Sequence, residues 1–245
     1  MARFLLIHGS CHGAWCWRDV LPHLHAAGHR ARAIDLPSHG DDPTPAGAVT
    51  LDLYADVILA AIDAAWDDGA EDGPLVLVGH SMAGYPVSLA AERAPEKIAR
   101  LVYLCAYVPA QGLSLADMRR AGPRQPLLDA IQRSADGLTF TIDPEKAVEK
   151  FYHDCPEIAG YALPRLCPQP ILPQETPLML TDAYGSVGRH YILCTDDRTI
   201  PPEYQSTMTG GWPEGRVSTM DSSHSPFFSA PAELAARLVR IAEGP

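Results

Sequence analysis

A short motif in the first half of the chain carries residue types suited to nucleophilic chemistry. It reads GHSMAG from Gly79 to Gly84 and lies between an apolar run, 75–78, and a helical stretch, 85–93. A serine in such a strand-to-helix turn has its hydroxyl lifted above the sheet edge, where helix N–H groups stabilise negative charge. Ala83 stands where this motif usually has glycine, and it is small enough for strand and helix to approach closely. The motif predicts Ser81 as a nucleophile.

A serine hydroxyl is a weak nucleophile at neutral pH and needs a base that is itself oriented by a third group. His224 is the preferred base among the ten histidines, because it lies in a loop after a late predicted strand and before the last predicted helix. Asp196 and Asp197 directly follow the predicted strand 190–194, at the carboxyl end where sites of α/β sheets lie. Either aspartate fits the orienting role on these grounds, and Asp221 is a weaker candidate.

Acyl transfer also needs donors for the negative oxygen that develops on the attacked carbonyl. The segment His8-Gly9-Ser10 follows the first predicted strand and is expected to bring backbone N–H groups beside the nucleophile. The amides of Ser10 and Met82 are therefore predicted to form the oxyanion hole. His8 and His12 also suggest a metal pair, but their surroundings supply no complete set of ligands, so a structural role is preferred for both.

Apolar runs of strand length alternate with stretches of helical periodicity over most of the chain. Alternation of this kind predicts an α/β fold, a mostly parallel sheet with helices on both faces. The carboxyl edge of such a sheet brings together loops that are distant in sequence. Strands are predicted at 4–7, 30–35, 75–78, 101–107, 190–194 and 216–220, and helices at 17–27, 51–66, 85–93, 202–207 and 232–243.

A proline-rich segment interrupts this alternation. Eight prolines lie between Pro109 and Pro170, and the segment has a single strand-like run, at 138–142. Its aromatic and leucine residues need burial, which argues against a disordered linker. We therefore expect an inserted cap at 109–170, carried by a core made of 1–108 and 171–245.

Composition limits the classes of partner. The chain has 245 residues, and its 30 acidic against 19 basic residues give a net charge of -11, which argues against nucleic acid and anionic membranes. No apolar run approaches the roughly 20 residues of a membrane span, and the N-terminal run is too short for a signal peptide. The six scattered cysteines fit free thiols in a reducing compartment. A cytoplasmic protein that acts on a small molecule is expected.

At the level of whole motifs, the sequence resembles the α/β-hydrolase superfamily. Within it, the chain is similar to the methylesterase and hydroxynitrile lyase family known from plants, with bacterial esterase relatives. The similarity spans nearly the whole chain and is weakest through the cap. It is carried by His8-Gly9-Ser10-Cys11-His12-Gly13-Ala14-Trp15, Gly28-His29, Ala33-Ile34-Asp35-Leu36, Gly79-His80-Ser81, Ala94-Pro95-Glu96-Lys97-Ile98, Tyr184-Gly185-Ser186-Val187 and Cys194-Thr195-Asp196-Asp197-Arg198-Thr199-Ile200-Pro201.

The resemblance implies roles that the residues alone leave open. In the family the catalytic aspartate precedes a basic residue in a stretch that ends Ile-Pro, which favours Asp197, followed by Arg198. Lyases of the family have a threonine after the first-strand histidine and a lysine after the catalytic histidine. Those positions are Gly9 and Ser225 here, so the lyase reaction is disfavoured. The two lysines of the cap, at 146 and 150, are not excluded by position alone.

The function expected from the sequence is that of a serine carboxylesterase acting on small to medium hydrophobic esters through an acyl-enzyme. The alternatives are lyase-type C–C cleavage and a non-catalytic ligand-binding protein. No cofactor or metal is expected, and the resemblance allows a homodimer. Gly9, Cys11 and Ser225 are expected to line the substrate pocket. An anionic ester is disfavoured, because Ser81, Ser10 and Gly9 offer no fixed cation.

Overall fold

The computed structural model describes residues 1–64 and 73–244 and contains a six-stranded sheet. The strand order is β2-β1-β3-β4-β8-β9, and every neighbouring pair is parallel. The α/β-hydrolase fold expected from the sequence is thus confirmed. The strands are β1 (Arg3–Ile7), β2 (Arg30–Ile34), β3 (Leu75–His80), β4 (Arg100–Leu104), β8 (Gly188–Cys194) and β9 (Val217–Met220).

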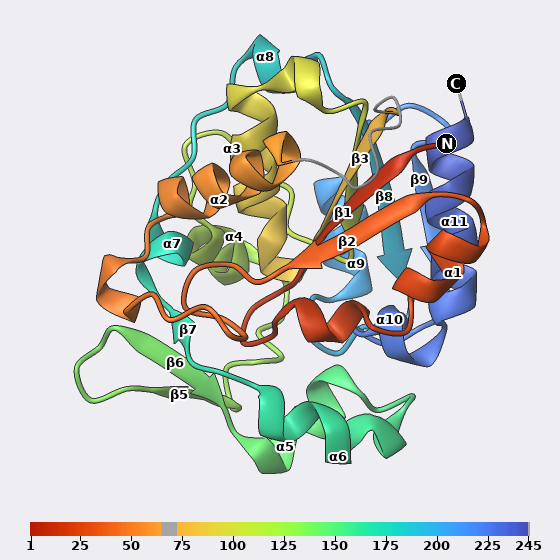
Figure 1. Ribbon diagram of the computed structural model, residues 1–245. Coiled ribbons are helices and arrows are strands. Elements are labelled where there is room, and N and C mark those ends of the chain that lie inside the picture. Colours follow the sequence, from red (N-terminus) through yellow and green to blue (C-terminus); the bar gives the residue numbers. More distant parts are fainter. Residues whose placement is uncertain (65–72, 245) are drawn as a thin grey trace.

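Helices cover both faces of this sheet, with α2, α3 and α8 on one side and α1 and α11 on the other (Figure 1). Two apolar layers result, one on each face, and the central strand β3 is buried along its whole length. Continuous burial of this kind is typical of a parallel strand covered on both sides. The helices outside residues 109–175 are α1 (Leu21–Ala26), α2 (Leu51–Asp63), α3 (Gly84–Arg93), α8 (Asp182–Gly185), α9 (Pro202–Met208), α10 (Pro226–Ser229) and α11 (Pro231–Glu243).

Two predicted helices differ from the observed ones in their extent. The stretch 17–27 is not one helix: a 3-10 turn, Ala14–Trp17, precedes the short α1, which is followed by Gly28 at a φ of +81°. The helix predicted at 51–66 begins where Thr50 caps it by accepting from the Leu53 amide. It is described as far as Asp63, and residues 65 and 66 of the prediction lie outside the described residues.

The segment 115–175 after β4 leaves the main sheet, and most of it lies beyond the carboxyl ends of the strands (Figure 1). It contains a second, antiparallel sheet in the order β5-β6-β7. Its elements are α4 (Leu115–Ala121), β5 (Ile131–Arg133), β6 (Thr139–Ile142), α5 (Pro144–Phe151), α6 (Ala159–Ala162), β7 (Gln169–Pro170) and α7 (Leu172–Glu175).

The sequence indicated only the middle strand of this second sheet, and that expectation was wrong. The flanking strands β5 and β7 have three and two residues, and two of the three residues of β5 are exposed. Strands this short have no hydrophobic alternation of their own. They form because each pairs its backbone with one edge of β6.

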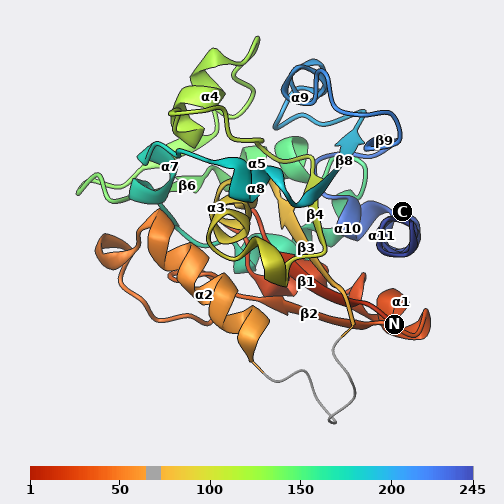
Figure 2. The same cartoon turned by 90° about the horizontal axis from the view of Figure 1, so that it is seen from above.

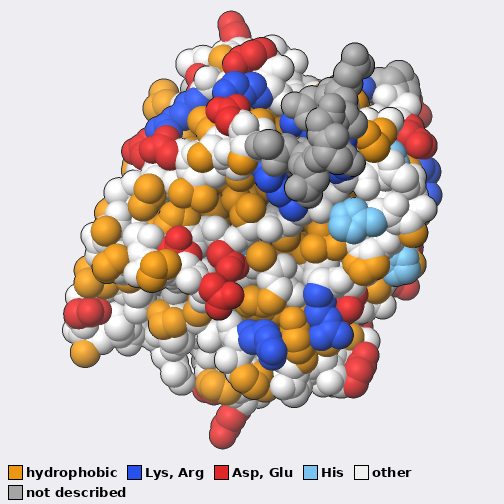
Figure 3. All heavy atoms as spheres, viewed as in Figure 1, with side chains coloured by type: hydrophobic (Ala, Val, Ile, Leu, Met, Phe, Trp, Pro, Cys, Tyr) orange, Lys and Arg blue, Asp and Glu red, His pale blue; other side chains and the backbone are white. Residues whose placement is uncertain are grey.

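The surface and the thiols can be compared with what the composition led us to expect. On the face in Figure 3, charged side chains of both signs are interspersed, and the described basic side chains form no continuous patch there. All six cysteines are free. Among the described residues, no helix is both long and apolar enough to cross a membrane.

Candidate active site

The turn that carries Ser81 is tight and its backbone is strained. Ser81 has a φ of +56°, in the left-handed region that non-glycine residues rarely adopt. A Cβ on Gly84 would lie 2.0 Å from the Tyr107 carbonyl oxygen, and one on Gly79 would lie 2.8 Å from Val87. Glycine at position 79 therefore permits the close approach of β3 and α3, and glycine at position 84 permits that of α3 and the segment after β4. Since the crowding falls on Gly84, the departure from the usual motif at residue 83 is tolerated.

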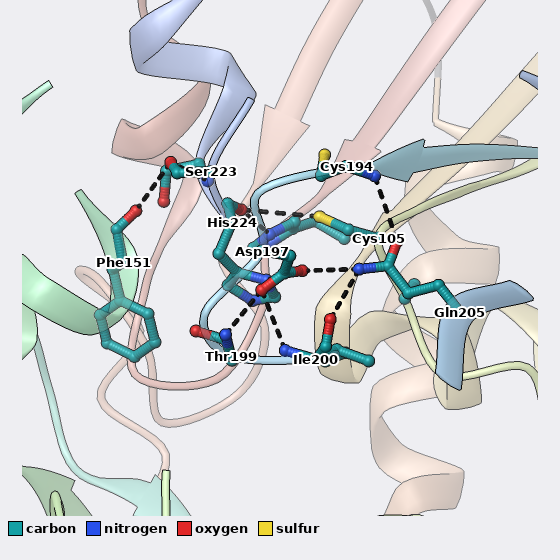
Figure 4. A network of polar contacts seen from close by, with 12 residues as sticks. Cys105, Phe151, Cys194, Asp197, Thr199, Ile200, Gln205, Ser223 and His224 are labelled. Carbon is teal, nitrogen blue, oxygen red and sulfur yellow. Dashed lines mark hydrogen bonds and ion pairs between the residues drawn. The ribbon is translucent and has the colours of Figure 1, made fainter. Parts of the chain in front are cut away.

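Asp197 and His224, from loops after β8 and β9, meet inside the protein (Figure 4). The Nδ1 of His224 lies 2.8 Å from Oδ2 of Asp197, and both side chains are almost fully buried. Asp196, the alternative acid, instead contacts the Nε2 of His153 at 2.9 Å on the surface. The structure therefore brings Asp197, and not Asp196, to the histidine.

The Asp197 carboxylate is surrounded by donors. Its Oδ1 accepts from the amides of Thr199 at 2.7 Å and Ile200 at 2.9 Å. Its Oδ2 accepts from Nε2 of Gln205 at 2.9 Å as well as from His224. A buried charge is costly unless each of its acceptors is satisfied, and this one is. No local sequence pattern indicates Gln205, because its role depends on α9 lying against the end of β8.

The backbone of His224 is also held in place. Its carbonyl accepts from Nε2 of His80 at 2.8 Å and from the Cys105 thiol at 3.6 Å. The His80 and His224 rings are 4.6 Å apart. His80 therefore connects the Ser81 turn to the loop of His224, a role that the sequence did not indicate.

Ligand atoms of His80, Cys105 and His224 lie within 4.8 Å of one another, the spacing of a candidate metal group. The residues do not fit a metal site. A metal-binding cysteine must be a thiolate, and burial raises the pKa of Cys105 well above its usual value. One nitrogen of each histidine is already in a hydrogen bond.

The loop after β1 is shaped by two histidines whose role the sequence did not indicate. His8 donates from Nδ1 to the Gly9 carbonyl at 2.8 Å, and His12 donates from Nδ1 to the Ser10 carbonyl at 2.8 Å. The Gly9 carbonyl and the Ser10 amide belong to one planar peptide, so fixing the carbonyl also fixes the direction of the amide. Within residues 1–64 and 73–244, the Ser10 amide has no hydrogen-bond acceptor.

A cavity joins these groups, with about 470 Å³ of space between protein atoms, part of it open to solvent. Ser81, Met82, Ser10 and His224 all line it, together with apolar side chains of the insertion. The full lining is Ser10, His12, His80, Ser81, Met82, Tyr107, Leu115, Arg119, Leu127, Phe140, Ile142, Phe151, Gln174, Thr199 and His224.

The three residues expected to line the substrate pocket do not reach this cavity wall. Cys11 has a φ of +62° and its side chain is buried in the apolar cluster beneath the insertion. Ser225 is fully buried, and its Oγ has no partner among the described residues. Gly9 lies behind the wall, where an added Cβ would be 2.7 Å from Nδ1 of His80.

The end of α5 is hydrogen-bonded to the loops that carry Asp197 and His224. The Thr199 hydroxyl donates to the Lys150 carbonyl at 2.9 Å, and the Ser223 hydroxyl donates to the Phe151 carbonyl at 3.3 Å. The Ser223 amide donates to the Asp154 carboxylate at 2.8 Å. Residues 150–154 therefore support the loops that carry Asp197 and His224.

Burial keeps the histidines around the site neutral. It lowers the pKa of His12 to about 4, and it lowers the pKa values of His8 and His80 well below the usual value. Neutral rings suit the observed contacts, because His12 also accepts from the Tyr152 hydroxyl at 2.7 Å through Nε2. Protonation of His12 would remove that acceptor.

This pKa gives a prediction for stability. An unfolded histidine titrates near 6.5 and folded His12 near 4, so the unfolded state binds more protons between these values, and stability falls as pH drops through that window. For His12 alone, the free energy of unfolding in urea should fall by about 2 kcal/mol from pH 7 to pH 5. His12→Gln should reduce this fall, whereas replacing exposed His23 should not. An equal fall in all three proteins would contradict the assignment.

Sequence and structure comparisons place the chain among known hydrolases. The sequence model of the "Alpha/beta hydrolase family" matches residues 4–237. Methylesterase 7 of Arabidopsis thaliana is 32% identical, with 98% of this chain and 96% of the relative covered. Esterase PIR7B of Oryza sativa subsp. japonica is 34% identical, with 98% and 95% covered.

Solved structures give the same result. A pyrethroid hydrolase from Sphingobium faniae JZ-2 has a TM-score of 0.86 and 29% identity, with 100% of this chain and 98% of that chain covered. A mutant of polyneuridine aldehyde esterase has a TM-score of 0.85 and 27% identity, with 99% of each chain covered. The chain therefore belongs to the alpha/beta hydrolase family, among its methylesterase-like members.

Proposed function

We propose that this carboxylic ester hydrolase is a serine carboxylesterase in which Ser81, His224 and Asp197 form the catalytic triad. The observation that carries the proposal is the buried bond of 2.8 Å between Asp197 and His224, at a cavity that Ser81 also lines. With Nδ1 donating to Asp197, Nε2 is the nitrogen of His224 left to act as base.

In this mechanism Nε2 of His224 takes the proton of the Ser81 hydroxyl as Oγ attacks the ester carbonyl carbon. The carbonyl oxygen becomes an oxyanion, and collapse of the tetrahedral intermediate releases the alcohol, which takes the proton back from His224. Water then attacks the acyl-enzyme by the same route and releases the acid. Asp197 stays ionised and stabilises the imidazolium that forms at each step.

The backbone amides of Met82 and Ser10 are assigned as the hydrogen-bond donors to the oxyanion. Met82 is in the first turn of the helix that follows the nucleophile, where N–H groups have no partner within the helix. The Ser10 hydroxyl adds a third donor. Its oxygen accepts from Nε2 of Gln174 at 2.8 Å, which leaves its hydrogen free to point into the cavity.

The segment 109–170 is proposed as the cap that selects the substrate. It contributes most of the apolar side chains around Ser81, among them Leu115, Leu127 and Phe140. Such a lining favours small to medium hydrophobic esters, including the methyl esters named for the relatives. A cytoplasmic location is part of the same proposal, supported by the six free thiols.

The lyase alternative finds less support. The threonine that the resemblance requires at position 9 would place a Cβ 2.7 Å from His80 and 2.9 Å from Ser81. Lys146 and Lys150, the lysines left open by sequence, both bind Asp129 and do not line the cavity. Among the described residues, no lysine lines the cavity beside His224, so none can stabilise the charge of a departing cyanide.

Replacement of the nucleophile tests the proposal. Ser81→Ala should lower kcat for p-nitrophenyl acetate by a factor of about 10³ or more, because the acyl-enzyme no longer forms. A fluorophosphonate should label the wild type at Ser81 and leave the variant unlabelled. Wild-type protein that neither turns over the ester nor takes the label would favour the non-catalytic, ligand-binding alternative.

The two neighbouring aspartates provide a matched pair for the second triad position. Asp197→Asn should lower kcat by a factor of about 10⁴, since the amide favours the wrong tautomer of His224. Asp196→Asn removes only a surface contact with His153 and should leave kcat within about twofold. Equal losses in both variants would refute the assignment of Asp197.

The third oxyanion donor can be tested separately. Ser10→Ala should lower kcat about tenfold with little change in KM, because the hydroxyl stabilises charge that develops only in the transition state. Gln174→Leu should also lower kcat, because the Ser10 hydroxyl loses the hydrogen bond that orients it. Gln132→Leu, on the exposed strand β5, is the control and should have no effect. Unchanged kcat in Ser10→Ala would leave only the backbone amides in this role.

A further inference from the structure

Among the described residues, an arginine reaches the catalytic cavity, contrary to the expectation from the sequence. Arg119, near the end of α4, lines the cavity together with Ser81. It also lines a neighbouring cavity of about 350 Å³ of space between atoms. Four residues are common to both walls, so Arg119 lies where the two cavities meet, and these four are Tyr107, Arg119, Leu127 and Thr199.

The guanidinium of Arg119 differs from its neighbours in having no partner. Arg120 pairs with Asp117 at 2.7 Å, Arg124 pairs with Glu203 at 2.7 Å, and Arg133 pairs with Glu175 at 3.2 Å. These three side chains are also about 60% exposed. Arg119 is partly buried, and its guanidinium makes no hydrogen bond or ion pair with any residue in 1–64 or 73–244.

Among the described residues, this arrangement leaves one positive charge at the site without a bonded carboxylate, because the nearby Glu175 pairs with Arg133. Burial lowers the pKa of Arg119, Tyr107 and the Glu175 carboxylate raise it, and the charges of Arg120 and Arg133 lower it further. An arginine nevertheless stays protonated at neutral pH. A partly buried cation without a partner is unfavourable, so a ligand that supplies an anion there gains more than it would at an exposed arginine.

The backbone of Arg119 is held in place, so its side chain starts from a fixed point at the cavity wall. Helix α4 begins with a capping box between Ser114 and Asp117. At its other end, Nε2 of Gln125 donates to the Arg119 carbonyl at 2.6 Å, and the Tyr204 hydroxyl donates to the Met118 carbonyl at 2.7 Å. Helix α4 also lies beside α7, which carries Gln174 (Figures 1 and 2).

We propose that Arg119 binds a carboxylate on the substrate, so that the preferred esters have an apolar body and an acidic group remote from the ester bond. The proposal rests on the proposed esterase function and narrows its substrate class. The ester group lies at Ser81 and the apolar body contacts Leu115, Leu127 and Phe140. The carboxylate lies at the junction of the two cavities, where a guanidinium binds both of its oxygens.

Pairs of esters that differ only in charge test this class. Monomethyl esters of succinic, glutaric, adipic and pimelic acid are compared with the corresponding methyl ester monoamides. The measured quantity is the ratio of kcat/KM for acid over amide, in which the concentration of active enzyme cancels. The best acid in the wild type should exceed its amide about tenfold or more. A ratio of one or below for every chain length would overturn the proposal.

Adjacent arginines supply the variant and its control. Arg119→Gln should lower the ratio about tenfold, and Arg119→Lys should keep part of the preference because the charge remains while the bidentate geometry is lost. Arg120→Gln removes an exposed charge outside the cavity and should leave the ratio unchanged. If Arg119→Gln leaves the ratio unchanged, or if Arg120→Gln lowers it equally, the preference for acids does not come from Arg119. Either result would refute the proposed carboxylate site.

A binding measurement separates this proposal from the esterase mechanism. Calorimetry of monomethyl glutarate with the Ser81→Ala protein requires no turnover. Adding Arg119→Gln should weaken binding about tenfold, and adding Arg120→Gln should not. If the wild-type protein hydrolyses none of the esters, the proposed function fails, and this comparison alone decides whether Arg119 binds carboxylates. Equal affinity with and without Arg119→Gln would overturn the assignment.

Discussion

The buried contact between Asp197 and His224 is the interaction on which the rest of the site depends. Two charged or polar groups inside a protein are stable only if their hydrogen-bonding capacity is met. The carboxylate of Asp197 has four donors, from two backbone amides, Gln205 and His224. Those donors come from three different segments, so the contact can form only when β8, α9 and the loop after β9 are all in place.

A second set of neutral groups fixes the positions around that contact. His80 holds the His224 carbonyl, and His8 and His12 hold the carbonyls of Gly9 and Ser10. Their low pKa values follow chiefly from burial, and each ring contributes a donor without bringing a charge next to the nucleophile. Histidine suits this role because a neutral ring has one donor and one acceptor.

The segment 115–175 has two structural roles. Its helix α5 and the residues after it bind the loops of Asp197 and His224, while α4 and the second sheet enclose the cavity. A segment that supports the loops of Asp197 and His224 cannot vary freely at those contacts. Variation in substrate preference is therefore expected in α4 and β6, which line the cavity without bonding to the catalytic loops.

The sequence by itself determined the parallel sheet, the strained turn at Ser81 and the loops in which His224 and Asp197 lie. These features are local, because apolar runs, turn residues and strand ends occur within short windows. Tertiary structure alone decided the short strands β5 and β7, the contacts of Gln205 and His80, and the absence of Cys11 and Ser225 from the cavity wall. It also decided that, of four neighbouring arginines in the described part of the chain, Arg119 is the one without a carboxylate. Each of these features depends on groups that are distant in sequence, and packing, not a local sequence pattern, determines which groups pair.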